Sequence, residues 1–205
     1  MFKFISSIAL AVMVTACATG TTNLTLAPPA ARPGVLSEAP PTRLDVEDVT
    51  DSRPNLTRIG DKRNGYGMVM GAIGTTQPPA DVVEQALEQA VTANNHILGG
   101  ADDRFALRTT LKTFWLDYRT GLVTVEFFAT INADVTLVDR TTGQTLYTET
   151  FEGYFSERNG GGLSNTWTRI LNEALGDFTT KVSMSDGLRA ALAATHEPAP
   201  AATGS

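Results

Sequence analysis

Cysteine and histidine are scarce in this sequence, and their scarcity removes whole classes of function. Among 205 residues there are one cysteine and two histidines, too few ligands for a disulfide framework or for a zinc site of the cysteine and histidine type. His96 and His196 lie far apart in the chain, and neither has a carboxylate or cysteine at metal-ligand spacing. We therefore predict no metal site, a capping or surface role for His96 at a helix end, and a place in the tail for His196.

Positive charge is also in deficit. The chain holds 16 Lys and Arg residues against 22 Asp and Glu residues, which gives a formal net charge of -6 at pH 7. Proteins that bind nucleic acid concentrate Lys and Arg on one face, where these side chains release counterions from phosphates. The sequence therefore predicts no nucleic-acid partner. A hydrophobic content of 42% with 19% charged residues is typical of a folded domain.

Catalytic motifs are missing as well. The sequence contains neither the G-x-S-x-G nucleophile elbow nor a P-loop, and the glycines at 160–162 lack the Gly-Lys-Ser/Thr that holds phosphate. No activated nucleophile and no pair of acid and base can be named. We predict a non-enzymatic protein without catalytic residues or a cofactor, in which these glycines form a flexible loop or an adaptable contact surface.

The one run of apolar residues that is not part of a folded pattern lies at the N-terminus. Phe4 to Val14 follows Lys3 and is too short to cross a bilayer core of about 30 Å, which is typical of a signal peptide. It leads into Val14-Thr15-Ala16-Cys17, which resembles the lipobox of bacterial lipoproteins. The resemblance implies cleavage between Ala16 and Cys17, and a diacylglyceryl group and an N-acyl chain such as palmitate on Cys17. A plain signal peptide with a chance cysteine is the alternative.

The predicted lipid places the protein on a membrane. Two or three acyl chains hold a protein there almost permanently, because each buried methylene contributes about 0.8 kcal/mol. Cys17 is the one cysteine of the chain, as expected if its thiol is acylated in an oxidising compartment. Ala18 stands where an Asp would resemble an inner-membrane retention signal. We therefore expect attachment to the outer membrane, on its periplasmic face.

Composition divides the chain into four parts. Residues 1–16 are the predicted signal peptide, and residues 17–42, rich in Pro, Ala and Thr, are predicted to be an extended tether. Residues 43–185 carry the patterns of a single α+β lipoprotein domain. Residues 186–205 are predicted to contain a short helix, near 186–194, and a disordered tail.

Short strands and helices are predicted from local patterns. Apolar alternation predicts a strand over 43–50, and a short strand over 68–70 lies in a glycine-rich stretch. Asp81 and Glu84 have capping-box spacing and predict a helix over 81–94 that ends at Asn94-Asn95. Apolar residues three and four apart after Ser164 predict a second helix, over 164–182.

Three longer strands are predicted between these helices. Phe105, Leu107, Leu111 and Trp115 share one parity, and every odd position from Val123 to Leu137 is apolar. Leu146 to Phe155 is predicted as the returning strand, with turns at 119–121 and 142–143. Trp115, together with Asp117 and Tyr118 near the first turn, is predicted either to form an exposed aromatic contact or to pack in the core.

Together these patterns predict an α+β fold. Its antiparallel sheet would have about four to five strands, in the order strand, short strand, helix, three-strand meander and helix. Each helix has one apolar stripe, and the sheet has one apolar face. We therefore expect both helices to pack on that face.

Two motifs resemble a known family. The lipobox and the tripeptide Asp51-Ser52-Arg53, followed by the loop Arg58-Ile59-Gly60, resemble the YajG-like lipoproteins of Gram-negative bacteria, an uncharacterised family. The order of predicted elements over residues 1–185 is similar too. The resemblance implies an envelope location and an α+β domain, and it supplies no catalytic residues. The Pro-rich linker and the tail are longer here than the family core requires.

Charged residues gather in two places near the first strand. For the acidic group, calcium would require a tight loop with a central glycine, so a solvated strand face is favoured. The basic group could bind an anionic glycan or lipid headgroup, or it could be a solvated loop in which Arg53 pairs with Asp51. The acidic group is Asp45, Glu47, Asp48 and Asp51, and the basic group is Arg53, Arg58, Lys62 and Arg63.

Two functions fit this sequence. The favoured one is a non-enzymatic accessory or scaffold lipoprotein in cell-envelope maintenance or assembly, which contacts another envelope protein through a sheet edge or its glycine-rich loops. The alternative is an auxiliary lipoprotein of an envelope transport system that binds lipid, glycan or another small ligand between sheet and helices. A carrier requires a continuous apolar cavity, whereas a scaffold requires a filled core.

Overall fold

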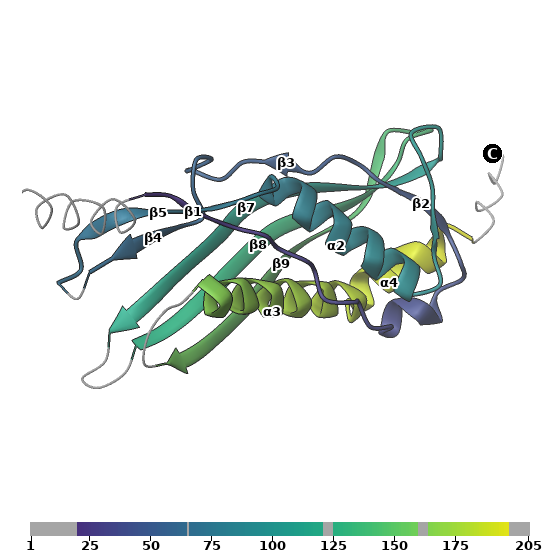
Figure 1. Ribbon diagram of the computed structural model, residues 1–205. Coiled ribbons are helices and arrows are strands. Elements are labelled where there is room, and N and C mark those ends of the chain that lie inside the picture. Colours follow the sequence, from purple (N-terminus) through teal and green to yellow (C-terminus); the bar gives the residue numbers. More distant parts are fainter. Residues whose placement is uncertain (1–19, 65, 121–124, 160–163, 197–205) are drawn as a thin grey trace, which may run out of the picture.

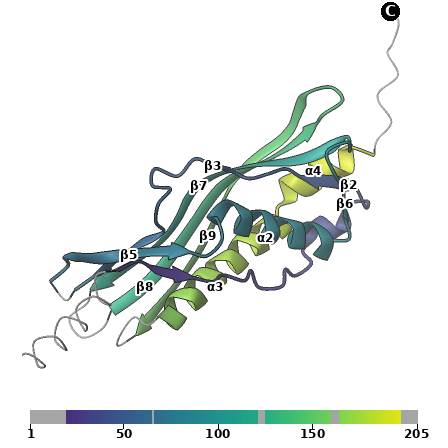
Figure 2. The same ribbon diagram turned by 45° about the horizontal axis from the view of Figure 1, so that its top comes forward.

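The computed structural model describes residues 20–64, 66–120, 125–159 and 164–196. Within these ranges, nine strands form one mixed sheet, and three α-helices and a short 3-10 helix accompany it (Figures 1 and 2). The strands are β1 (Thr22–Leu24), β2 (Arg43–Val46), β3 (Thr50–Asp51), β4 (Gly60–Arg63), β5 (Val69–Thr75), β6 (Ile97–Leu98), β7 (Phe105–Thr120), β8 (Val125–Asp139) and β9 (Gln144–Asn159). The helices are η1 (Val35–Glu38), α2 (Pro79–Ala93), α3 (Ser164–Ser183) and α4 (Asp186–Ala194). None of the helices in these ranges has the length and apolar character needed to cross a membrane.

The predicted meander of three antiparallel strands is present as β7, β8 and β9. Strand β8 pairs along its whole length with β7 on one side and with β9 on the other. Its odd positions from Phe127 to Leu137 are buried, and its even positions face the opposite side of the sheet. A positive φ of 71° at Gly143 closes the turn between β8 and β9, as the sequence predicted.

A β-bulge changes the parity of β7. The register with β8 shifts between Leu111 and Thr113, so one extra residue, Lys112, is accommodated there. Before the bulge Leu107 and Leu111 are buried, but after it the buried positions are even, beginning with Phe114. The single parity predicted for β7 was therefore wrong, and half-buried Trp115 lies on the face away from the core.

The predicted antiparallel sheet of four to five strands was also wrong, because the other edge of β7 is used by parallel strands. Strands β2, β3 and β4 pair with β7 one after another along this edge. Beyond them, β6 pairs with β2, and β5 and β1 continue the sheet from β4. The chain reaches β7 from β2 through α2, a crossover that returns the chain in the same direction and makes the pair parallel. Several of these strands have two to four residues, too few for a period of two to be visible in the sequence.

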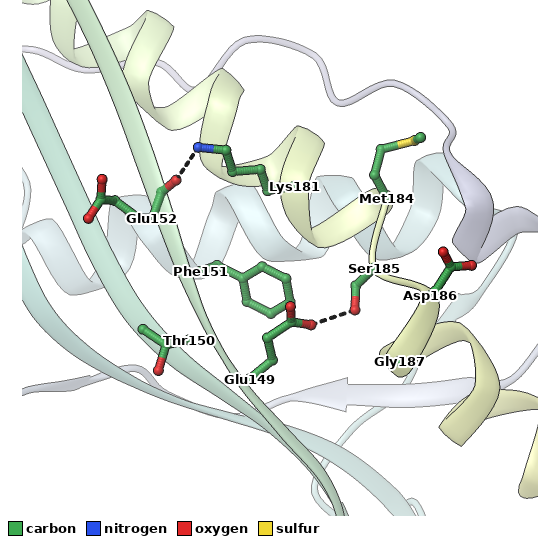
Figure 3. Close-up of a pocket in the computed structure, with 9 residues that line it drawn as sticks. All are labelled: Glu149, Thr150, Phe151, Glu152, Lys181, Met184, Ser185, Asp186 and Gly187. Atoms are coloured by element: carbon green, nitrogen blue, oxygen red, sulfur yellow. Dashed lines mark hydrogen bonds between the residues drawn. The ribbon is translucent and has the colours of Figure 1, made fainter.

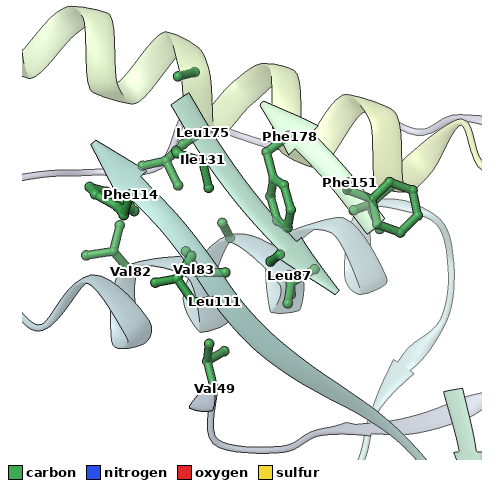
Figure 4. Close-up of a cluster of buried hydrophobic side chains, with 14 of the residues drawn as sticks. Val49, Val82, Val83, Leu87, Leu111, Phe114, Ile131, Phe151, Leu175 and Phe178 are labelled. Atoms are coloured by element: carbon green, nitrogen blue, oxygen red, sulfur yellow. The ribbon is translucent and has the colours of Figure 1, made fainter. Parts of the chain in front are cut away.

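Helices α2 and α3 cover one face of the sheet, as predicted, and the fold remains α+β (Figures 1 and 2). Side chains of α2 such as Leu87 and of α3 such as Phe178 meet those of the strands, including Ile131 (Figure 4). Each of these three side chains is fully buried. The predicted short helix at 186–194 is α4, whose Leu188 and Leu192 are buried.

The ends of α2 differ in how well the sequence predicted them. The helix begins at Pro79 rather than Asp81, with Pro78 as N-cap and without a side-chain cap, so the predicted capping box was wrong. A proline is favoured in the first helical turn because its missing N–H leaves no backbone donor unsatisfied. The predicted C-terminus is confirmed, since Asn94 is the C-cap and Asn95 has a positive φ of 64°.

The segment predicted as an extended tether packs on the domain instead. From Thr22 it adds β1 to the sheet, and it then runs past α3 and forms η1 near α4. Leu24, Leu26 and Leu36 are all at most 4% exposed. These three leucines, dispersed among Pro, Ala and Thr, are enough to hold the segment, which we call the N-terminal arm (residues 20–42).

Helix α3 satisfies the free edge of β9. Within the described ranges β9 pairs only with β8, so its outer backbone groups need other partners. The Asp177 carboxylate accepts from the backbone N–H of Tyr154 at 2.9 Å, and Lys181 Nζ donates to the carbonyl of Glu152 at 2.7 Å. These two side chains also pair with each other at 2.8 Å. The middle of the β9 edge is therefore already occupied.

Gly153 allows the close approach of α3 to β9, and we expect Gly153→Val to destabilise the protein. A Cβ there would lie 2.3 Å from the Ala174 carbonyl oxygen and 2.6 Å from Phe178 Cβ. Overpacking of this kind costs about 1–3 kcal/mol, to be measured by urea unfolding. Gly100→Ala, where a Cβ meets nothing within 4 Å, is the control; equal loss in both variants would contradict this account.

Candidate functional site

The acidic residues near the first strand form an ion-pair network around Arg140. Arg140 bonds to Asp45 and lies 2.8 Å from Glu47, whose other carboxylate oxygen is 2.7 Å from Arg108 Nε. Burial raises the pKa of Glu47, but hydrogen bonds from both arginines outweigh it and hold that pKa below its ordinary value. Asp48 is exposed outside this network. Within the described ranges no cluster of His, Cys, Asp and Glu is arranged to hold a metal ion.

The tripeptide Asp51-Ser52-Arg53 is a structural unit at the end of β3. Arg53 Nε and Nη2 donate to the two carboxylate oxygens of Asp51 at 2.8 and 2.7 Å. Burial raises the pKa of Asp51, but these bonds and a backbone bond from Arg53 lower it overall. The Ser52 N–H donates to the Leu111 carbonyl of β7 at 2.9 Å. The tripeptide therefore fixes β3 on β7, and Arg53 is paired as the solvated-loop alternative predicted, although its side chain is buried.

A pocket of about 410 Å³ lies beside this ion pair, between residues 53–59 and residues 74–79. The Arg53 side chain is only 4% exposed. Its Nη1 has no hydrogen-bond partner in the part of the chain that the structure describes, but almost none of its surface is open to solvent. The guanidinium therefore forms part of the pocket wall, and its one unpaired donor is buried there.

The remaining basic residues of this region do not converge on one site. Arg58 and Arg63 both pair with Asp61, at 3.1 and 3.2 Å. Lys62 points to the other face of β4, where its Nζ donates to Thr22 Oγ1 at 3.1 Å. The predicted anionic-ligand loop of Arg58, Lys62 and Arg63 is thus divided between two faces of one strand.

Both histidines fasten the N-terminal arm. His96 is 4% exposed, contrary to the capping or surface role expected for it. Its Nδ1 accepts from the Thr42 N–H, and its Nε2–H donates to the Leu36 carbonyl, each at 3.2 Å. This arrangement requires the neutral ring. Burial and the nearby His196 lower the pKa of His96, against the bond to Leu36. His196 Nε2 is 3.0 Å from Thr42 Oγ1.

A pocket of about 440 Å³ lies between β9 and the junction of α3 with α4 (Figure 3). Ser185 Oγ donates to the Glu149 carboxylate at 2.6 Å and accepts from the Leu188 N–H at 3.1 Å. The Tyr147 hydroxyl donates to the same oxygen of Glu149 at 2.7 Å. Ser185 is the N-cap of α4, so its hydroxyl holds the start of that helix.

Aromatic side chains gather on the sheet face that α2 and α3 leave uncovered. Trp115 and Tyr154 lie in one row across the sheet, each opposite Thr130 of β8. The Phe128 and Tyr154 rings are 6.2 Å apart, and the Arg119 guanidinium lies 4.5 Å above the Phe128 ring. We call these four residues, Trp115, Arg119, Phe128 and Tyr154, the open-face cluster. Tyr154 is 37% exposed, and Trp115 and Phe128 are half-buried.

The sequence predicted part of this cluster. Trp115 and Tyr118 were expected to act together, but Tyr118 packs against Phe127, 5.9 Å away, on the helix side of the sheet. Phe128 and Tyr154 were missed, although each is a large aromatic residue at an otherwise polar position of an alternating strand. Ala16, Cys17 and Gly160 to Gly162 lie outside the described residues.

Comparison with known proteins relates the chain to others by fold. No family model and no curated protein matches the sequence. A Xanthomonas campestris protein of the DUF330 family shares 16% identity with a TM-score of 0.58, over 85% of this chain and 97% of that one. A minor lipoprotein from Acinetobacter baumannii gives 13% and 0.45, over 73% and 93%. A candidate lipoprotein from Caulobacter crescentus gives 12% and 0.43, over 80% and 96%. The likeness to the Xanthomonas protein shows a shared fold.

The buried His96 predicts a specific loss of stability in mild acid. Its pKa lies below the ordinary 6.5 in the folded protein, so the unfolded chain takes up the proton first as the pH falls. Stability is therefore full above the unfolded pKa and decreases as the pH falls below it. Urea midpoints at neutral and mildly acidic pH should show a smaller decrease for His96→Gln than for the unsubstituted protein. Parallel decreases in the two proteins would contradict the neutral ring.

Proposed function

We propose that the protein is a lipid-anchored accessory protein of the bacterial envelope. Acylated Cys17 would hold it at the periplasmic face of the outer membrane, and the open-face cluster would bind another envelope protein. The observation that carries the proposal is the contrast between the two faces of one sheet. One face is filled by α2 and α3, and the other carries the exposed Tyr154 and the half-buried Trp115 and Phe128.

The composition of the open-face cluster fits a protein partner. Trp, Tyr and Arg are the residue types that contribute most of the binding energy at protein interfaces. All four side chains project from long paired strands, so the backbone that carries them needs no ordering when they bind. Further along the same face of β8, Asp134 accepts from Lys112 and Thr150, and bonds from these two residues hold the pKa of Asp134 below its ordinary value. A partner that extends this far along β8 would meet a carboxylate that is already paired with a cation.

Binding through the face is favoured over strand addition at β9. Asp177 and Lys181 occupy backbone groups in the middle of that edge, and an added strand would have to displace both. The open face requires no such displacement. This modifies the expectation that a partner would use a sheet edge.

The alternative function, a carrier of lipid or glycan, has less support from the packing. Its ligand would lie between sheet and helices, where Leu87, Ile131 and Phe178 are fully buried against one another. A ligand there would have to separate α3 from β9, which approach closely at Gly153. We also propose that the chain is related to the YajG-like lipoproteins, on the basis of the lipobox and Asp51-Ser52-Arg53.

The anchor is tested by Cys17→Ser. Without the thiol no diacylglyceryl group can be attached, so we expect the protein to move from the membrane fraction or to keep residues 1–16. Cell fractionation and the mass of the intact protein measure both outcomes. A Cys17→Ser protein that is processed and sediments with membranes like the unsubstituted one would contradict acylation.

The partner surface is tested by photocrosslinking in intact cells. A photoreactive phenylalanine in place of Tyr154 should give a defined product with one envelope protein, because it lies at the exposed side of the cluster. The same residue in place of Gln85, exposed on α2, is the matched control on the opposite face. Arg119→Glu should weaken the product at position 154. Equal products at positions 85 and 154, or none at 154, would refute binding through the open face.

A further inference from the structure

The turn between β4 and β5 presents apolar side chains to solvent. Tyr66 is 91% exposed, Met68 57%, Val69 51% and Met70 36%. We call residues 66–70 the hairpin tip. Four large apolar side chains within five consecutive residues are a concentrated exposed patch, and such patches mark protein or membrane contact sites.

The hairpin tip is an ordered structure. The Asn64 N–H donates to the Met68 carbonyl at 3.0 Å, and the Gly67 N–H donates to the Asn64 carbonyl at 2.9 Å. The Asn64 side-chain oxygen also accepts from the N–H groups of Tyr66 and Met68, each at 3.0 Å. Gly67 has a positive φ of 80°, which favours glycine. These bonds hold the apolar side chains outward, where the other described residues leave them exposed.

The start of the N-terminal arm lies beside the same hairpin. Strand β1 pairs in parallel with β5, with Thr22 opposite Ile73. Two residues earlier on both strands, Gly71 lies beside Gly20, because a Cβ on Gly71 would be 2.6 Å from the Gly20 carbonyl oxygen. Going back along β1 from Thr22 therefore leads toward the tip, and both lie at the end of the molecule opposite α4 (Figure 1). Cys17 precedes Gly20 by three residues, which span at most about 11 Å.

We propose that the hairpin tip docks on the lipid bilayer beside the acyl chains of Cys17. The inference rests on the proposed anchor and adds a second point of membrane contact to it. Tyr side chains favour the interface between lipid and water, and Met and Val favour its apolar side. Arg63, at the base of the tip, pairs with Asp61 and keeps 37% of its side chain exposed, and this exposed part would face the lipid phosphates.

A bilayer is the occupant that the position of the tip favours. An anchor at most about 11 Å from Gly20, which lies beside Gly71 of β5, keeps this end of the sheet near the membrane surface. Even a weak affinity of the tip's side chains is then satisfied by the high effective concentration of lipid. A protein partner on the tip would have to bind within the same narrow zone. Docking at two points would also fix the tilt of the domain and direct the open-face cluster at a constant angle to the membrane.

The test uses the acylated protein reconstituted into vesicles of phosphatidylethanolamine and phosphatidylglycerol. In a Tyr66→Cys variant the new thiol is labelled with an environment-sensitive fluorophore, since the acylated Cys17 does not react. Thr142→Cys, exposed in the β8–β9 turn at the far end, is the matched control. We expect blue-shifted emission and strong quenching by lipid-borne quenchers at position 66, and neither at position 142.

The outcomes separate the tip from the anchor. Vesicle flotation without a spectral difference between positions 66 and 142 would overturn docking of the tip and leave the anchor intact. Failure to float at all would refute the anchor. Met68→Glu in the Tyr66→Cys protein should reduce the quenching at position 66 while flotation and the urea midpoint stay unchanged, because Met68 is exposed. Undiminished quenching in that variant would overturn the role assigned to the apolar side chains.

Discussion

Pairing along both edges of β7 is the interaction on which the rest of the structure depends. One edge joins the antiparallel meander, and the other holds β2, β3 and β4 in succession. The N-terminal half of the chain is therefore assembled on a strand that follows it in sequence. The bulge at Lys112 shifts the register between β7 and β8. After it the apolar residues of β7 stand at even positions, and because of the bulge these still face the core.

Elements with enough residues to show a period were predictable from the sequence, and short or bulged elements were not. Strand β8 alternates without interruption, and α3 repeats its apolar residues at three and four, so both were assigned correctly. Strands β3 and β6 have two residues each, which leaves no period to detect. The N-terminal arm was misassigned because Pro and Ala around Leu24, Leu26 and Leu36 have the composition of a spacer, and composition does not report where three leucines are buried.

In the candidate site, too, contacts between residues close in sequence were predictable, and contacts between distant residues were not. The pairing of Arg53 with Asp51 was foreseeable from two opposite charges at i and i+2, but Arg140 is distant in sequence from the Asp45 and Glu47 that it joins. The open-face cluster unites residues of three strands, and its membership depends on the register and on the bulge.

Burial of the N-terminal arm also affects the proposed anchoring. Because the arm packs on the domain, an anchor at Cys17 would hold the domain close to the bilayer rather than on a long spacer.

Asp177 and Lys181 occupy backbone groups of β9, and this would matter most if many copies of the protein were held on one membrane surface. Proteins attached to one membrane surface collide far more often than the same number free in solution, and an open strand would invite them to join edge to edge into continuous sheets. With the amide of Tyr154 and the carbonyl of Glu152 already engaged, neighbouring copies find no continuous ladder along the middle of β9. If Cys17 is acylated as we propose, crowding at the membrane would raise the local concentration of the protein without adding strands to this part of β9.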